Sequence, residues 1–313
     1  MMAIGADSPP EPTSTGSTEL GPLFDAAFVA KLERLVVVAK RLRQASRVGD
    51  KKAPRRGSGL EFSDHRAYAP GDDLRRLDWN LFGRLGRTMV RLYEQEEEQA
   101  LFVLIDTSAS MALGGPRKAD LALQVAAALA YIGLCHRDAV FLHPFAETLG
   151  DPLTSPPDRG PFAALLARLG ALGFRGSADL PATLGALRAL PSRPGVCIVV
   201  SDLLEVGPVP PAVDHLLRRK LEVALLRITS PQDREGTGLG PGPTRLCDSE
   251  TGTEVDLELT PALLRRYAER FSRQEAALLG HARRRRVPFV SVDAAVPFDE
   301  VVLRLLRAEG LLL

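Results

Sequence analysis

Asp106, Ser108 and Ser110 alternate directly after the apolar residues 101–105, in the sequence LFVLIDTSASM. A carboxylate and two hydroxyls at two-residue steps can face one point just past the end of a strand. These groups are hard oxygen ligands, which suit Mg²⁺ or Mn²⁺ in octahedral geometry. A cap on the following helix would use the same residue types, because Asp and Ser favour N-cap positions. From these residues alone, the two interpretations are equally supported.

A second aspartate, Asp202, follows another apolar stretch, residues 196–201, in the sequence VCIVVSDLLE. In a doubly wound α/β sheet, ligands bind at the carboxyl ends of the strands, where the strand order reverses. Two apolar strands that each end on an aspartate are a more specific signal than either strand alone. We therefore expect Asp106 and Asp202 to meet at that edge of a sheet.

Short apolar strands alternate with helical stretches after residue 100. Strands are expected at residues 101–105, 139–145, 196–201, 222–228 and 288–292, and helices at 118–136, 160–170, 180–190, 211–219, 261–286 and 298–309. A β-hairpin interrupts this alternation at residues 244–258, with its turn at residues 249–252. The alternation is typical of βαβ units with helices on both faces of the sheet. The predicted fold class is α/β, a doubly wound, mostly parallel sheet of Rossmann type.

The length of 313 residues suggests more than one unit. Residues 1–22 are rich in Ser, Thr, Pro and Gly, which predicts a disordered tail. Apolar residues recur at helical spacing in residues 23–49, which predicts a helical arm. Residues 50–99 predict a β-rich extension packed on the α/β domain of residues 100–313.

The bulk composition argues against several classes of protein. A net charge of +1 gives no overall attraction to nucleic acid or membrane. The longest apolar run, residues 121–134, is shorter than the roughly 18 residues that span a bilayer, and the N-terminus lacks a signal-peptide pattern. Cys135, Cys197 and Cys247 lie far apart, so neither a zinc site nor a disulfide framework is indicated. We expect a cytoplasmic protein with no transmembrane segment.

Basic residues gather in two places, which raises the question of nucleic-acid binding. They are Lys51, Lys52, Arg55 and Arg56, and the run at residues 283–286. No aromatic residue interleaves either group, so no platform for base stacking is evident. The second run closes a helix, where cations complement the helix dipole. We therefore expect no nucleic-acid partner.

Two motifs resemble those of known families. DTSAS looks like the metal-ion-dependent adhesion site of von Willebrand A-type domains, which reads Asp-x-Ser-x-Ser, then a distant Thr and a distant Asp. The upstream segment FSDHRAYAPGDDLRRLDWNLFGR resembles the signature of the bacterial domain of unknown function 58 family. The matching residues are Arg66, Tyr68, Pro70, Gly71, Asp72, Arg75, Arg76, Asp78, Trp79 and Arg84. With the hairpin LCDSETG and the final strand and helix, the resemblance covers roughly residues 55–310.

This resemblance implies a von Willebrand A-like fold and a non-enzymatic adaptor or co-chaperone. Its implied partners are a MoxR-type AAA+ ATPase and unidentified client proteins. The implied ligands of a Mg²⁺ ion are Asp106, Ser108, Ser110 and Asp202. The family's third loop usually carries a Thr ligand, whereas GSADL places Ala178 there. Ser177 or Asp179 would supply the missing oxygen if the loop shifted by one residue.

Two further interpretations stay open. A metal-dependent phosphohydrolase would use Asp106 as its nucleophile, but Ser108 stands where a second acid is expected and no GxxxxGK[ST] pattern occurs. We therefore expect no enzymatic activity. The candidates for a partner-binding surface are Arg66, Asp72, Arg75, Arg76, Asp78 and Trp79. These charges would alternatively form an ion-pair network that pins the extension to the sheet, with Trp79 in the core.

Overall fold

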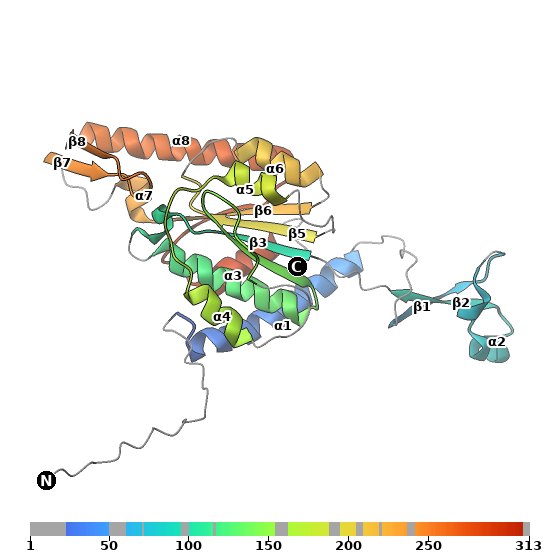
Figure 1. Cartoon of the computed structure of the whole chain (residues 1–313). Helices are drawn as coiled ribbons and strands as arrows, with labels where there is room; N and C mark the ends of the chain where they lie inside the picture. Colours follow the sequence, from blue (N-terminus) through green and yellow to red (C-terminus); the bar gives the residue numbers. More distant parts are fainter. Residues whose placement is uncertain are drawn as a thin grey trace, which may run out of the picture.

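The structure is a computed structural model of the chain (Figure 1). It describes residues 23–49, 61–70, 72–94, 100–114, 117–153, 162–187, 195–204, 209–218, 221–236 and 242–308. The predicted tail at residues 1–22 and the basic residues Lys51, Lys52, Arg55 and Arg56 lie outside these ranges.

A five-stranded parallel sheet lies at the centre of the described residues, with the strand order β4–β3–β5–β6–β9. Its strands are β3 (Ala100–Asp106), β4 (Ala139–Phe145), β5 (Gly195–Ser201), β6 (Leu221–Thr229) and β9 (Phe289–Asp293). From β3 the chain moves to β4 on one side, and it then returns to β5 on the other side of β3. The strand order therefore reverses between β3 and β5, where sheets of this kind bind ligands.

Helices cover both faces of this sheet (Figure 1). One layer holds α1 (Ala26–Gly49), α3 (Lys118–Cys135), α4 (Phe162–Gly170) and α9 (Phe298–Arg307); the other holds α5 (Leu180–Ala186), α6 (Val209–Arg218) and α8 (Pro261–Arg285). Successive side chains of a strand point to opposite faces. Accordingly, Val103 and Ile105 of β3 pack with the first layer, and Phe102 and Leu104 with the second. The predicted doubly wound α/β fold is confirmed.

Helix α1 belongs to this α/β body and is not a separate arm. Its residues Phe28, Leu32 and Leu35 are buried in the same apolar core as α3 and α9, which α1 contacts. The sequence showed the helical spacing of these residues. It did not show which surface they cover, because that depends on contacts with elements far away in the chain.

The sequence predicted that no apolar stretch is long enough to span a bilayer, and helix α3 corrects this expectation. It is 18 residues long and, by length and composition, apolar enough to cross a membrane. Of this helix, 72% is buried inside the domain, as in the core helix of a soluble protein. The apolar side chains of α3 therefore pack against the sheet, α1 and α9.

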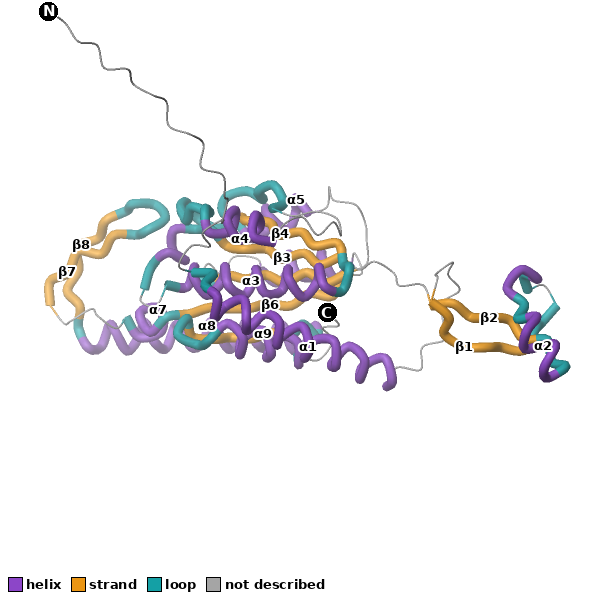
Figure 2. Tube along the Cα trace, turned by 90° about the horizontal axis from the view of Figure 1, so that it is seen from below, coloured by secondary structure: helices purple, strands orange, loops and turns teal. Residues whose placement is uncertain are grey.

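Residues 61–94 form a small unit of their own. Strand β1 (Glu61–Ala67) pairs antiparallel with β2 (Met89–Glu94), and between them lie the short 3-10 helix η1 (Leu74–Arg76) and α2 (Trp79–Leu85). Leu77 and Val90 are buried and bridge η1 to β2. Figures 1 and 2 both draw this unit apart from the α/β body, so the predicted packing against the sheet is not seen.

The predicted hairpin is present as β7 (Gly242–Cys247) and β8 (Glu254–Leu259). It lies with α7 (Pro231–Glu235), the short helix after β6, at the carboxyl edge of the sheet. The β1–β2 unit lies at the opposite end of the molecule (Figure 1). The hairpin is therefore at the edge where the candidate site lies.

Candidate cation site

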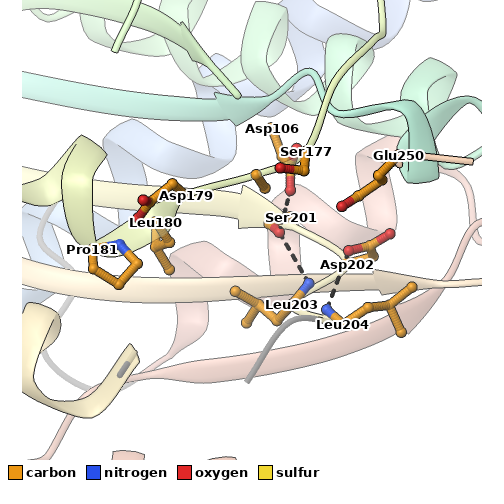
Figure 3. Close-up of a pocket in the computed structure, with 11 residues that line it drawn as sticks. Asp106, Ser177, Asp179, Leu180, Pro181, Ser201, Asp202, Leu203, Leu204 and Glu250 are labelled. Atoms are coloured by element: carbon orange, nitrogen blue, oxygen red, sulfur yellow. Dashed lines mark hydrogen bonds between the residues drawn. The ribbon is translucent and has the colours of Figure 1, made fainter. Parts of the chain in front are cut away.

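A cavity of about 300 Å³ opens at the switch point between β3 and β5 (Figure 3). Asp106 ends β3 and Ser201 ends β5, with Asp202 next in the chain. The cavity is lined by Asp106, Ser177, Ala178, Asp179, Leu180, Pro181, Ser201, Asp202, Leu203, Leu204 and Glu250. The two aspartates that the sequence placed at this edge therefore share one cavity.

Asp106 is fully buried, and each of its carboxylate oxygens accepts a hydrogen bond. Its Oδ1 accepts the backbone N–H of Ser108 at 2.9 Å, and its Oδ2 accepts the hydroxyl of Ser201 at 2.5 Å. Burial and the nearby charge of Asp202 raise the pKa of Asp106 to about 6, although the hydrogen bonds from Ser108 and Ser201 oppose this rise. The site therefore holds negative charge that a bound cation would stabilise.

Ser108 and Ser110 present their hydroxyls together. Their Oγ atoms are joined by a hydrogen bond of 3.0 Å, and both residues are buried. Neighbouring ligands of an octahedral Mg²⁺ with bonds of about 2.1 Å are separated by about 3.0 Å. Ser108 occupies the N-cap position of the short 3-10 helix η2 (Ala109–Ala112), but its side chain makes no capping hydrogen bond. The Ser108 hydroxyl therefore pairs with Ser110 and does not cap the helix.

Asp202 already has a positive partner. Lys118, the first residue of α3, is fully buried, and its Nζ lies 2.7 Å from Asp202 Oδ2. The same ammonium lies 3.0 Å from Asp233 Oδ2, on α7. Burial alone would lower the pKa of Lys118, but the two carboxylates outweigh it and raise the pKa above its usual value. Asp202 therefore lines the cavity and is also paired with Lys118.

Two more residues hold this charged cluster in place. Asp233 forms a capping box with Ser230, with Ser230 N–H and hydroxyl donating to Asp233 Oδ2 at 2.8 and 2.9 Å. Arg227 is fully buried, donates from Nε to the carbonyl oxygen of Asp202 at 3.0 Å, and lies 4.3 Å from the ring centroid of Phe271. Arg227 therefore holds the backbone of Asp202, and Asp233 holds the ammonium of Lys118 beside the site.

Sequence reasoning missed Lys118, Arg227 and Asp233. The Ser-x-x-Asp spacing of Ser230 and Asp233 is a readable signal, because it is the pattern of a capping box. Lys118 and Arg227 gave no signal, because a single basic residue in a helix or strand usually points to solvent.

The third loop is docked directly onto the DTSAS segment. Ala109 N–H donates to Gly176 O at 2.9 Å, and Arg175 N–H donates to Thr107 O at 2.8 Å. Ala178 lines the cavity and packs against the apolar core, so no oxygen comes from the position of the family's Thr.

The two predicted substitutes for that Thr behave differently. Ser177 and Asp106 line the same cavity (Figure 3). Asp179 lies farther along the loop, where its Oδ1 caps α5 by accepting the N–H of Ala182 at 2.8 Å. Ser177 is therefore the better placed of the two, and Asp179 is committed to the helix.

The donor set fits a hard, partly hydrated cation. Within the described ranges, no three His, Cys, Asp or Glu residues lie close enough together to hold a metal. A cation here would therefore rest on Asp106 and the hydroxyls of Ser108 and Ser110, with waters completing the shell. Mg²⁺ accepts such a site, because it usually keeps several waters and binds only one or two carboxylates.

The charged residues of the predicted partner surface mostly hold their own unit together. Asp72 accepts the guanidinium of Arg66 at 2.8 Å. Asp78 caps α2 by accepting the N–H groups of Asn80 and Leu81, both at 3.0 Å, and its other oxygen lies 2.8 Å from His65 Nε2. These contacts all lie within residues 61–94.

The other three candidates for the partner-binding surface are Arg75, Arg76 and Trp79. Arg75 is exposed, and the side chain of Arg76 lies outside the described part of the structure. Trp79 is 64% exposed, so the alternative that placed it in the core is wrong and it stays a surface candidate. Its ring lies 6.3 Å from that of Phe82, edge to face. Leu74 and Leu85 of the same short segment are also exposed, and we call these four residues the Trp79 face.

Among solved structures, the chain is similar to the protein BatB from Bacteroides thetaiotaomicron. The two are 13% identical, with a TM-score of 0.41 over 66% of this chain and 97% of that one. The VWA domain of SpRpn10 is also 13% identical, with a TM-score of 0.35 over 66% of this chain and 94% of that one.

Sequence comparison gives a broader match. The chain is 28% identical over 253 residues to the uncharacterized protein Rv1480 of Mycobacterium tuberculosis, covering 78% of this chain and 77% of the relative. Residues 64–277 match the family described as "Protein of unknown function DUF58". This match spans the Trp79 face, the candidate cation site and the hairpin. The chain therefore belongs to the DUF58 family.

Proposed function

We propose that this chain is a non-enzymatic protein-interaction module that binds Mg²⁺ at the carboxyl edge of its sheet. The bound ion would hold an acidic group of a partner protein. The observation that carries this proposal is the position of Asp106, Ser108 and Ser110 at the switch point, with the two hydroxyls 3.0 Å apart and no role in helix capping.

The residues that would hold the ion differ in their contribution. Asp106 supplies the negative charge, and Ser108 and Ser110 supply neutral oxygens. Ser177 lines the same cavity, and Asp202 offers Oδ1, which accepts a hydrogen bond of 3.3 Å from Leu204 N–H. The ion would supply positive charge at the mouth of the cavity, which a carboxylate of a partner would complement.

The proposed partners are a MoxR-type AAA+ ATPase and its client proteins, in the cytoplasm. The ATPase follows from the family resemblance. The Trp79 face is proposed as a second contact surface, because exposed aromatic residues are enriched at protein interfaces. The cytoplasmic setting agrees with the three free cysteines, of which Cys197 is fully buried.

A binding experiment with the MoxR-type ATPase of the same organism tests this function. Nucleotide-free ATPase is titrated with wild-type protein, Asp106→Asn and Trp79→Ala, each in Mg²⁺ and in EDTA. We expect binding by the wild type in Mg²⁺, its loss in EDTA and in Asp106→Asn, and weaker binding by Trp79→Ala. Equal binding under all these conditions would contradict the proposal.

The phosphohydrolase alternative is not proposed. Ser108 stands two positions after Asp106, where an aspartate-based phosphatase would carry a second acid. Assays with generic phosphate esters, in Mg²⁺, provide the check. Turnover that Asp106→Asn abolishes would revive the alternative.

A further inference from the structure

Leu203, which lines the cavity just after the end of β5, has an unusual backbone conformation. Its φ is 47°, in the left-handed region, which strains a bulky side chain. Within the described ranges, Arg137 and Arg286 also have a positive φ, but both lie close to the end of a helix, where this conformation is common. Leu203 instead follows a strand at the candidate site. Strain of this kind persists only where the surrounding contacts hold it.

Side chains from two other elements hold the backbone around Leu203. Gln274 of α8 donates from Nε2 to Leu204 O at 2.7 Å and to Leu203 O at 3.3 Å. Arg227 of β6 donates from Nε to Asp202 O at 3.0 Å. Three consecutive carbonyl oxygens therefore accept hydrogen bonds from side chains of distant parts of the chain. The strained conformation is thus held from outside its own segment.

The conformation of Leu203 determines where its own N–H points. This N–H donates to Ser201 Oγ at 3.0 Å, and the Ser201 hydroxyl donates in turn to Asp106 Oδ2 at 2.5 Å (Figure 3). A hydroxyl has a single hydrogen, so Ser201 can accept from Leu203 and donate to Asp106 at the same time. The other oxygen of Asp106 accepts the N–H of Ser108. Ser201 and Ser108 together therefore orient the carboxylate of Asp106.

These contacts form one continuous path from α8 to Asp106. Gln274 holds the carbonyls of Leu203 and Leu204, Leu203 directs its N–H to Ser201, and Ser201 orients Asp106. Partners of this kind orient the ligands of metal sites, and their loss typically weakens metal binding by about 10- to 100-fold. A side chain on a different element can in this way affect a cation without being its ligand.

We propose that Gln274 is a positioning residue for the cation site. It holds Leu203 at a positive φ and, through Leu203 and Ser201, keeps the carboxylate of Asp106 in one orientation. Gln274 acts through the backbone and is not a ligand of the ion. This inference rests on the proposed function, because the orientation of Asp106 matters for binding only if the cation binds there.

Calorimetric titration of Mn²⁺ into the full chain is the first test. We expect Gln274→Leu to weaken Mn²⁺ binding by about tenfold, because Asp106 is no longer held in one orientation. Gln124→Leu is the matched control, since Gln124 Nε2 of α3 also donates to a backbone carbonyl, that of Leu23, at 3.1 Å. The control should stay within about twofold of the wild type, because distant sites act independently.

Hydrogen exchange in EDTA tests the same path without the cation. The amide of Leu203 should exchange about tenfold faster in Gln274→Leu than in the wild type, because the bonds that hold its conformation are lost. In Gln124→Leu this amide should exchange as in the wild type. Nuclear magnetic resonance resolves the single amide.

Rescue by Leu203→Gly separates positioning from packing. Glycine adopts a positive φ without strain, so residue 203 then no longer needs Gln274. In the Leu203→Gly background, Gln274→Leu should change Mn²⁺ affinity by less than about twofold. The same weakening in both backgrounds would overturn the inference. If Leu203→Gly does not fold, the comparison of Gln274→Leu with Gln124→Leu decides alone.

The remaining outcomes distinguish the inference from the proposed function. Wild-type affinity for Mn²⁺ in Gln274→Leu, or unchanged exchange of the Leu203 amide, would overturn the inference while leaving the cation site intact. No Mn²⁺ binding by the wild type would overturn the proposed function and the inference with it.

Discussion

Among single residues, Asp106 has the clearest consequence for stability. Its pKa is raised from 3.8 to about 6, chiefly by burial and then by Asp202. In this window the folded chain retains a proton that the unfolded chain has released, so stability falls as the pH rises from about 4 to 6. Above pH 6 the loss is constant, on the order of 3 kcal/mol.

Replacing Asp106 by Asn removes this pH dependence. In EDTA, we predict that Asp106→Asn gains stability relative to the wild type as the pH rises from about 4 to 6, by up to about 3 kcal/mol. Urea unfolding at several pH values measures this gain. The control Asp256→Asn changes an exposed hairpin carboxylate and should show no such trend. A difference between Asp106→Asn and the wild type that is the same at every pH would contradict the explanation.

Replacing Lys118 should also change the stability of the fold strongly. Lys118→Met leaves the buried Asp202 and the half-buried Asp233 without their shared cation, and loss of one partner of a buried ion pair costs about 3–5 kcal/mol. Lys31→Met, which breaks the partly exposed pair with Asp299, should cost less than about 1 kcal/mol. Urea unfolding measures both. Equal costs for the two variants would show that the buried cluster does not stabilise the fold.

At the scale of elements, the third loop sets the strength of the site. The loop is held against the DTSAS segment by backbone hydrogen bonds, and Ala178 lines the cavity. We predict that Ala178→Thr, which adds a hydroxyl there, tightens Mg²⁺ binding by about three- to tenfold. Ala178→Val has nearly the same shape without the oxygen and should give no gain. Calorimetry compares the two, and identical behaviour would place the loop outside the cation's ligand shell.

The sequence predicted much of this edge but not all of it. Asp106 and Asp202 follow apolar strands, and parallel strands deliver their carboxyl ends to one edge, so local pattern was sufficient to bring them together. Lys118, Asp233 and Glu250 reach the same place only because the strand order β4–β3–β5–β6–β9 brings α3, α7 and the hairpin together. Such long-range neighbours leave no periodic signal in a single sequence.

The same reason explains the errors at the N-terminal side. Helical spacing was visible in α1, but its burial against α3 and α9 was not. The alternative that placed Trp79 in the core rested on its residue type, yet Trp79 is 64% exposed on a unit in which Leu77 and Val90 are buried. Residue type predicts burial only on average, and a small unit has little interior for a large ring.

At the scale of the whole molecule, residues 61–94 and the α/β body should respond separately to mutation. Asp78 caps α2 and bonds His65, so Asp78→Ala should destabilise this unit by about 1–2 kcal/mol. Hydrogen exchange of residues 61–94 should accelerate, while the far-ultraviolet circular dichroism transition of the α/β body stays unchanged. Asn80→Ala, at an exposed position of α2, is the matched control. A lower transition for the whole chain in Asp78→Ala would mean that the two parts unfold as one.

The central claim is the cation site at the carboxyl edge, and calorimetric titration of Mn²⁺ into the wild type and Asp106→Asn tests it most directly. We predict one ion per wild-type chain with a Kd below about 1 mM and no binding by Asp106→Asn, because Asp106 is the charged ligand among neutral hydroxyls. No heat from the wild type at several times that concentration, or the same isotherm from both proteins, would contradict the claim.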